Sequence, residues 1–147
     1  MFTLRPFEEA DFDTLYAIDQ SCFDPEIAYS RHELHFFIHR PTAMTIIALD
    51  QIEIAGFVIV DLERQKSGHI ITIDVGNEYR KQGVGTLLIQ AAEEHVRQSK
   101  RKSMLLEVAV TNSRARRFYE KHGYLELRVM RDYYKTGTDA LLMGKNL

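Results

Sequence analysis

The segment between residues 70 and 99 constrains the fold most, because it joins a strand to a long helix through a glycine-rich turn. Ile71, Ile73 and Val75 alternate with more polar residues, which is the period of a half-buried strand. After the turn, apolar residues recur at steps of three and four, which predicts an amphipathic helix: Val84, Leu87, Leu88 and Ala91. The chain therefore contains a strand-turn-helix unit near its centre.

The turn from Arg80 to Gly85 predicts an anion site. The first amides of a helix have no intrahelical acceptor and carry the positive end of the helix dipole. Gly83 and Gly85 would remove side chains that keep a ligand away from those amides, and Arg80 and Lys81 add positive charge. A phosphate or pyrophosphate fits this pattern. The alternative is a glycine-marked helix start with ordinary surface charge.

Two common phosphate loops do not fit this turn. The dinucleotide fingerprint needs three glycines in the turn after a strand, and the third is missing here. The nucleoside-triphosphate loop needs Lys and then Ser or Thr after its last glycine, but Thr86 follows Gly85 directly. A different class of phosphate-containing ligand is expected.

Composition excludes several other classes. A net charge of −2 gives no reason to expect nucleic acid as a partner. The longest apolar runs, residues 45–49 and 54–60, are too short to span a bilayer, and no basic-then-apolar leader begins the chain. Cys22 is the only cysteine, so no internal disulfide forms, and a small apolar filler in a cytoplasmic protein is expected.

The remaining patterns predict one domain over residues 1–147. Strands are expected at residues 1–6, 42–49, 52–62, 70–76, 103–110, 124–131 and 140–143, and helices begin near Glu8, Ser30, Val84 and Thr111. The resulting order is β-α-α-β-β-β-α-β-α-β-β. Mixed runs of strands and helices favour an α/β (α+β) fold, with a mixed, mostly antiparallel sheet flanked by helices.

The region between residues 23 and 40 is rich in aromatic and histidine side chains. Tyr29, Phe36 and Phe37 either line a substrate groove or form an ordinary apolar stripe in the core. The three histidines at helical spacing have no Cys or acidic companion that would complete a metal site, so no metal is expected: His32, His35 and His39.

A second motif lies after the strand at residues 103–110. It contains Asn112, Ala115, Phe118, Tyr119, Gly123 and Tyr124 at fixed spacing, and Leu106-Glu107-Val108 precedes it. Together with Arg-x-x-Gly-x-Gly at the earlier helix, this half of the chain resembles the GNAT superfamily of N-acetyltransferases. It is most similar to the RimI-type branch, which acetylates the N-terminal α-amine of proteins. The first half resembles the family only in the order of its elements.

The resemblance implies a role for each matching position, with acetyl-CoA as cosubstrate. The backbone of Ile73, Asp74 and Val75 would pair with the pantetheine arm, and Asn112 would hydrogen-bond to it. The pyrophosphate would bind the turn and helix start: Arg80, Lys81, Gln82, Gly83, Val84, Gly85 and Thr86. Glu107 would be the general base, and Tyr119 the general acid that protonates the leaving thiolate.

These roles are chemically reasonable. An N-terminal α-amine has a pKa of about 8, so one carboxylate, acting directly or through water, suffices as the base. The thioester oxygen gains charge during attack, and a strand amide such as that of Val75 could stabilise it. A lysine side chain, with a pKa of about 10.4, would need more help to lose its proton.

The two proposed catalytic side chains could instead have purely structural roles. Glu107 could form an ion pair with Arg116, Arg117 or Lys102. Tyr119 could be a core aromatic residue with a solvated hydroxyl.

Three further residues have the same ambiguity. Asn112 could only cap the helix. Tyr133 and Tyr134 could pack at the edge of the sheet, or could close over a bound peptide N-terminus as substrate-binding residues.

Two departures from the RimI pattern leave the acceptor open. Ala109 stands where Arg is common, and Gly76-Asn77 where Asp-Pro is usual. The acceptor is expected to be a protein or peptide N-terminus. The alternatives are a small amine such as a polyamine, aminoglycoside or amino acid, and a non-catalytic acyl-CoA-binding module. No nucleic acid or membrane partner is expected, and the protein would be a monomer or homodimer.

Overall fold

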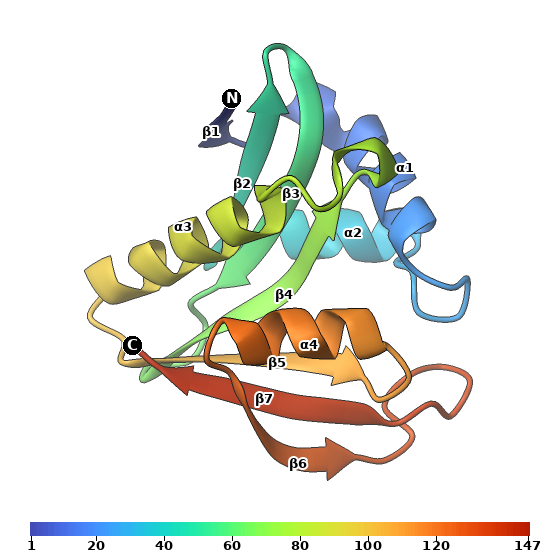
Figure 1. Ribbon diagram of the computed structural model, residues 1–147, viewed down its shortest axis with the longest axis vertical. Helices are drawn as coiled ribbons and strands as arrows, with labels where there is room; N and C mark the ends of the chain where they lie inside the picture. The colour runs from blue at the N-terminus through green and yellow to red at the C-terminus, as the bar shows by residue number, and fades with distance from the viewer.

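A seven-stranded sheet runs through the computed structural model, which describes residues 1–147 (Figure 1). The strand order is β1-β2-β3-β4-β5-β7-β6, and every neighbouring pair is antiparallel except β4 and β5. The strands are β1 (Phe2–Pro6), β2 (Ala43–Asp50), β3 (Glu53–Asp61), β4 (Ser67–Val75), β5 (Ser103–Ala109), β6 (Leu125–Met130) and β7 (Ala140–Asn146). This confirms the predicted element order and the mixed, mostly antiparallel sheet.

Helices cover both faces of the sheet: α1 (Phe12–Cys22), α2 (Arg31–Ile38), α3 (Val84–Gln98) and α4 (Ser113–Lys121). Figure 1 shows α3 and α4 in front of the sheet, with α1 and α2 behind it. Behind the sheet, Leu15 and Leu34 pack against Phe57 of β3 in a smaller apolar cluster. In front, the larger cluster joins the buried faces of α3 and α4 to the sheet.

The predicted amphipathic helix is α3, and its buried face carries the apolar stripe seen in the sequence. Leu88, Ala92 and Val96 are fully buried against the sheet. Burial of a leucine or valine side chain stabilises the fold by roughly 1.5–3 kcal/mol. The helix is therefore held in place mainly by this stripe.

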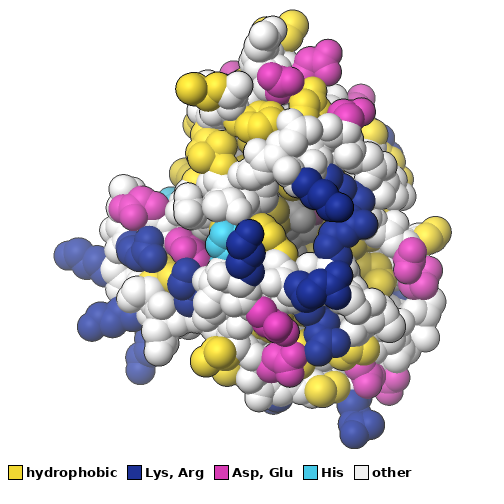
Figure 2. All heavy atoms as spheres, viewed as in Figure 1, with side chains coloured by type: hydrophobic (Ala, Val, Ile, Leu, Met, Phe, Trp, Pro, Cys, Tyr) yellow, Lys and Arg dark blue, Asp and Glu magenta, His cyan; other side chains and the backbone are white.

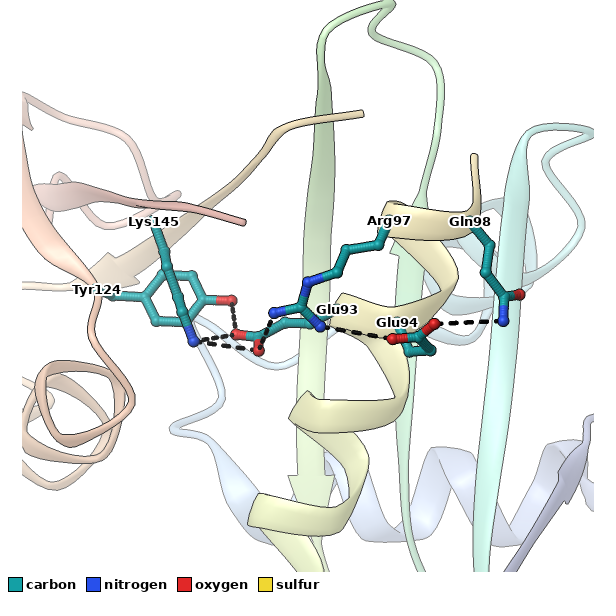
Figure 3. Close-up of polar contacts among 6 residues, drawn as sticks. All are labelled: Glu93, Glu94, Arg97, Gln98, Tyr124 and Lys145. Carbon is teal, nitrogen blue, oxygen red and sulfur yellow. Dashed lines mark hydrogen bonds and ion pairs between the residues drawn. The ribbon is translucent and has the colours of Figure 1, made fainter. Parts of the chain in front are cut away.

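One charged residue interrupts the buried face of α3. The Glu93 carboxylate accepts hydrogen bonds from the Tyr124 hydroxyl at 2.8 Å and from Lys145 Nζ at 3.1 Å (Figure 3). Arg97 of α3 lies 3.8 Å from the same carboxylate. Because Tyr124 immediately precedes β6 and Lys145 lies in β7, this cluster fixes α3 to the second half of the sheet.

Several boundaries differ from the prediction. β4 begins at Ser67, three residues before the predicted start at residue 70, because Ser67 to Ile70 gain a parallel partner in β5. The first helix is preceded by a 3-10 turn, Glu9–Asp11. α4 begins at Ser113 rather than Thr111 because Asn112 caps it. None of the helices has the length and apolarity needed to cross a lipid bilayer.

Candidate active site

The site lies where β4 and β5 separate. The two strands pair in parallel from Ser67 opposite Ser103 to Ile70 opposite Leu106, and not beyond. β4 nevertheless continues to Val75 and β5 to Ala109. The backbone of β4 between Ile71 and Val75 therefore has no strand partner on the β5 side, and an extended ligand could pair with it.

A β-bulge explains the separation. Ile59 of β3 is opposite Thr72 of β4, but Val60 is opposite Ile70, so Ile71 is an extra residue. A bulge bends its strand and increases the local twist, which turns the end of β4 away from β5. It also changes which side chains face each helix layer. Ile73 and Val75 pack on the α3 side, whereas Asp74 is buried beside α1.

The start of α3, where the sequence predicts an anion site, presents free backbone groups. Gly83 is the N-cap with φ of +87°, and Lys81 also has a positive φ of 62°. No side chain caps the helix and its first turn has no acidic residue, so the amides of Val84, Gly85 and Thr86 remain available. A Cβ atom at Gly83 would meet nothing within 4 Å, so the space before these amides is open. The geometry fits a pyrophosphate.

Gly85 also has a structural function. A Cβ atom there would lie 3.1 Å from the Phe118 ring, so this glycine permits close packing of α3 against α4. Thr86 Oγ1 lies 3.1 Å from His122 Nε2, which adds a second α3–α4 contact. The Gln82 amide donates to the Glu78 carbonyl and so stabilises the turn.

Positive charge surrounds this part of the surface. Figure 2 shows Lys and Arg side chains gathered around a hollow in the face that carries α3 and α4. Arg80 and Lys81 come from the turn before α3, and Arg114 and Arg117 come from α4. This arrangement attracts an anionic ligand to the gap between β4 and β5.

Tyr119 of α4 lies at the same gap. Its side chain is only 8% exposed and its ring packs edge-on against Phe118 and Tyr124. Burial, with a smaller contribution from nearby Asp74 and Tyr134, raises the pKa of the Tyr119 phenol. Its hydroxyl makes no hydrogen bond within the chain. A protonated, unpartnered phenol at this position can donate a proton to a ligand atom.

A cavity of about 100 Å³ lies on the opposite, α2-facing side of the separated strands. Apolar and aromatic side chains form most of its wall: Tyr29, Phe37, Ile71, Tyr133 and Tyr134. The two remaining wall residues are His69 of β4 and Glu107 of β5. This cavity brings together the α1–α2 loop, α2, two strands and the β6–β7 loop.

Glu107 is paired with His69 inside this cavity. His69 Nε2 lies 2.6 Å from Glu107 Oε1, and the Glu107 side chain is only 9% exposed. The alternative of an ion pair with Arg116, Arg117 or Lys102 is wrong. Arg116 instead bonds the Val110 carbonyl and the Glu126 carboxylate. The carboxylate and imidazole together form a proton acceptor at the wall of the cavity.

Tyr133 and Tyr134 extend from the β6–β7 loop to the cavity. Tyr133 is 45% exposed and Tyr134 is half-buried. Burial, with the Glu107 carboxylate close by, raises the pKa of Tyr133. Burial also raises the pKa of Tyr134, with Tyr133 and Glu107 as smaller causes. Both phenols remain neutral at physiological pH, so they can form the lid of the cavity without adding charge.

The sequence alone missed His69 and left Tyr29 undecided. His69 lies just before the predicted strand at residues 70–76, and only its register with Leu105 places it next to Glu107 on one face. Tyr29 and Phe37 line the cavity, whereas Phe36 is 52% exposed beneath the Arg40 guanidinium and does not.

Other predicted site residues have structural functions that limit what they can offer. Asn112 Oδ1 accepts from the Ala115 amide at 3.1 Å, so only its side-chain NH₂ group is free for a ligand. The Asp74 side chain points into the core, and Val84 is buried at 1% exposure, so both can offer only backbone groups. Among the three histidines at helical spacing, His39 pairs with Glu9. No group of three potential metal ligands is present.

Comparison with known proteins identifies the class of enzyme. The sequence model of the acetyltransferase (GNAT) family matches residues 12–124. The chain therefore belongs to this family of acyltransferases, which use acetyl-CoA as the acetyl donor.

Individual relatives agree with this classification. An uncharacterized N-acetyltransferase of Methanocaldococcus jannaschii is 31% identical over 143 residues, or 97% of this chain and 90% of the relative. N-alpha-acetyltransferase 30 of Schizosaccharomyces pombe is 30% identical, covering 95% of both chains. The ribosomal-protein-S18-alanine N-acetyltransferase of Escherichia coli shares the fold, with a TM-score of 0.86, 23% identity, and coverage of 99% and 94%.

Proposed function

We propose that this protein transfers the acetyl group of acetyl-CoA to the N-terminal α-amine of a protein or peptide. The observation that carries the proposal is the His69–Glu107 pair in the wall of a mostly apolar cavity. That cavity lies on the opposite side of the separated strands from the open start of α3. Donor and acceptor could therefore enter from two faces and meet in the gap.

The donor side fits acetyl-CoA. The free amides of α3 and the neighbouring Arg80 and Lys81 would hold the pyrophosphate. The unpaired backbone of Ile73 to Val75 would pair with the pantetheine arm, and the free NH₂ group of Asn112 would donate to it. When bound, acetyl-CoA supplies the activated thioester.

The protein groups then account for each proton. Glu107, assisted by His69, accepts a proton from the attacking amine. The backbone amide of Val75 stabilises the negative charge that develops on the thioester oxygen. Tyr119 donates its proton to the departing thiolate, a role that the raised pKa of this phenol permits because the proton is retained above neutral pH.

The cavity indicates the kind of N-terminus. Five of its seven wall residues are hydrophobic, and its volume of about 100 Å³ suits one aliphatic side chain. We infer an acceptor whose first residue is apolar and of leucine or methionine size. The names of the N-alpha-acetyltransferase relatives support a protein acceptor.

The other two interpretations fit less well. A polyamine or aminoglycoside carries several cations, but the cavity contains one carboxylate, which is already paired with His69. A non-catalytic acyl-CoA-binding module would need neither Glu107 nor Tyr119. Replacing Tyr119 with Phe separates these cases, since an enzyme should lose turnover while retaining its affinity for acetyl-CoA.

The test is an acetylation assay with peptides that differ only in the first residue. Peptides beginning with Leu, Met or Ile should be acetylated with higher kcat/KM than those beginning with Ser, Gly or Asp. Spermidine and kanamycin serve as small-amine acceptors. Acetylation of these amines in the absence of any peptide acetylation would overturn the proposed acceptor.

A further inference from the structure

Two carboxyl groups lie against each other in the core beneath the end of β4. Asp19 of α1 and Asp74 of β4 are both fully buried. The Tyr29 amide donates to Asp19 Oδ2 at 2.8 Å, and the Thr72 hydroxyl donates to Asp74 Oδ1. The other two oxygens, Asp19 Oδ1 and Asp74 Oδ2, are buried and have no hydrogen-bond partner.

Burial and the unpartnered oxygens favour one proton held between the two carboxyl groups. Two adjacent buried carboxylates repel each other, and neither has a Lys or Arg partner that would offset the charge. One proton removes the repulsion and lets one carboxyl group donate to the other. Burial, together with the carboxyl group of Asp19, raises the pKa of Asp74 well above its ordinary value. Burial likewise raises the pKa of Asp19.

The pair connects the two halves of the site. Asp74 lies between Ile73 and Val75, whose backbone forms the proposed donor site. Asp19 holds the backbone of Tyr29, and the Tyr29 side chain lines the acceptor cavity. One turn along α1, the Cys22 thiol donates to the Val75 carbonyl at 3.4 Å. The last turn of α1 therefore contacts both the donor strand and the loop that forms one wall of the acceptor cavity.

We propose that the proton shared by Asp19 and Asp74 positions the acceptor cavity. It holds Tyr29 against the unpaired end of β4, and loss of the proton weakens acceptor binding. This inference rests on the proposed function, because it concerns the same cavity. Asp19 and Asp74 are positioning residues, since neither lines the cavity itself.

Burial keeps the neighbouring thiol and phenols neutral over the pH range of the test below. Burial raises the pKa of the Cys22 thiol to about 11. Burial also raises the pKa of the Tyr29 and Tyr119 phenols, so both stay neutral. The Glu33 pKa is lowered by its hydrogen bond to the Ser30 backbone, so Glu33 stays ionised. Arg80 lies beside Cys22. The His69–Glu107 pair faces the acceptor cavity and acts on the amine itself.

The test compares the wild type with Asp74→Asn between pH 6 and pH 10. The asparagine amide donates to Asp19 at every pH and so replaces the shared proton. The acceptor KM of the wild type should rise relative to the variant, by up to about tenfold per pH unit once the shared proton is lost. Titration of the acceptor amine affects both enzymes equally.

Two further variants control for folding. Asp19→Asn also supplies a permanent donor, toward Asp74, and should flatten the KM profile in the same way. Asp74→Ala removes the hydrogen bond and should raise KM at all pH values. If the KM profiles of the wild type and Asp74→Asn are parallel, the positioning proposal is wrong.

A melting experiment separates this proposal from the proposed function. A carboxyl group whose pKa is raised by folding destabilises the folded state as pH increases, from its unfolded pKa up to its folded pKa. The Tm of Asp74→Asn should therefore exceed that of the wild type, with a difference that increases with pH. If no peptide is acetylated but this difference appears, the shared proton stands and the acceptor assignment fails. Equal Tm profiles would overturn the shared proton.

Discussion

The donor and acceptor sides of the site are built from different kinds of groups. On the donor side, the start of α3 and the unpaired end of β4 offer mostly backbone amides and carbonyls. On the acceptor side, side chains from five separate elements meet in one cavity. One chain thus combines a site defined by backbone geometry with a site defined by side-chain identity.

This difference between backbone and side-chain groups indicates which substitutions can change the substrate of the enzyme. Backbone groups keep their positions when side chains change, so the donor site tolerates substitution except at positions such as Gly83. A cavity lined by side chains changes shape with each substitution. We therefore expect substitutions on the acceptor side to change turnover and acceptor choice, and those at the start of α3 to change acetyl-CoA affinity alone.

The largest effect should come from removing the base. Glu107→Gln keeps the size and the contact with His69 but lowers the ability to accept a proton. We expect kcat to fall by roughly 100- to 1,000-fold, within the usual contribution of a general base. Acetyl-CoA affinity, measured by calorimetry, should stay unchanged. Glu120→Gln, an exposed position on α4, is the control. A variant at position 107 with full turnover would show that another group is the base.

The donor side gives the next largest effect, through Gly83. Its positive φ is tolerated best by Gly, Asn and Asp, so Gly83→Asn and Gly83→Asp form a pair that differs only in charge. The aspartate should weaken acetyl-CoA binding roughly 10- to 100-fold relative to the asparagine, the range expected for a charge about 4 Å from a phosphate. Titration calorimetry measures this directly.

The variants Gly83→Asn and Gly83→Asp also test whether the donor side can be changed without affecting the acceptor side. With saturating acetyl-CoA, both variants should show the acceptor KM of the wild type. An equal loss of affinity in both would mean that steric filling of the open space matters more than charge. An unchanged affinity in both would remove the start of α3 from the donor site.

Sequence reasoning succeeded where the determinants are local. The strand, the glycine turn and α3 are contiguous, so their pattern predicts these elements. The parallel register of β4 with β5 and the extra residue Ile71 depend on contacts between distant segments. The pairing of His69 with Glu107 follows from that register and from nothing in the neighbouring sequence. The Asp19–Asp74 contact likewise joins residues that are 55 positions apart.

A smaller effect is expected from reshaping the acceptor cavity. Ile71→Ala removes atoms from the wall and should let a larger first side chain enter. We expect the ratio of kcat/KM for peptides beginning with Phe to those beginning with Leu to rise by about tenfold. Ile54→Ala, a half-buried β3 position outside the cavity wall, is the matched control. If both variants change the ratio equally, the cavity does not select the first residue.

The smallest effect concerns the pH dependence of turnover. Burial raises the pKa of Tyr119 above its ordinary value near 10, so the phenol keeps its proton at higher pH than a free tyrosine would. The kcat measured at saturating acceptor should therefore decline by less than about twofold between pH 8 and pH 10. A steep fall between pH 8 and pH 9 would mean that an acid with a lower pKa than Tyr119 protonates the thiolate, and the donor side would then depend on a side chain not yet identified.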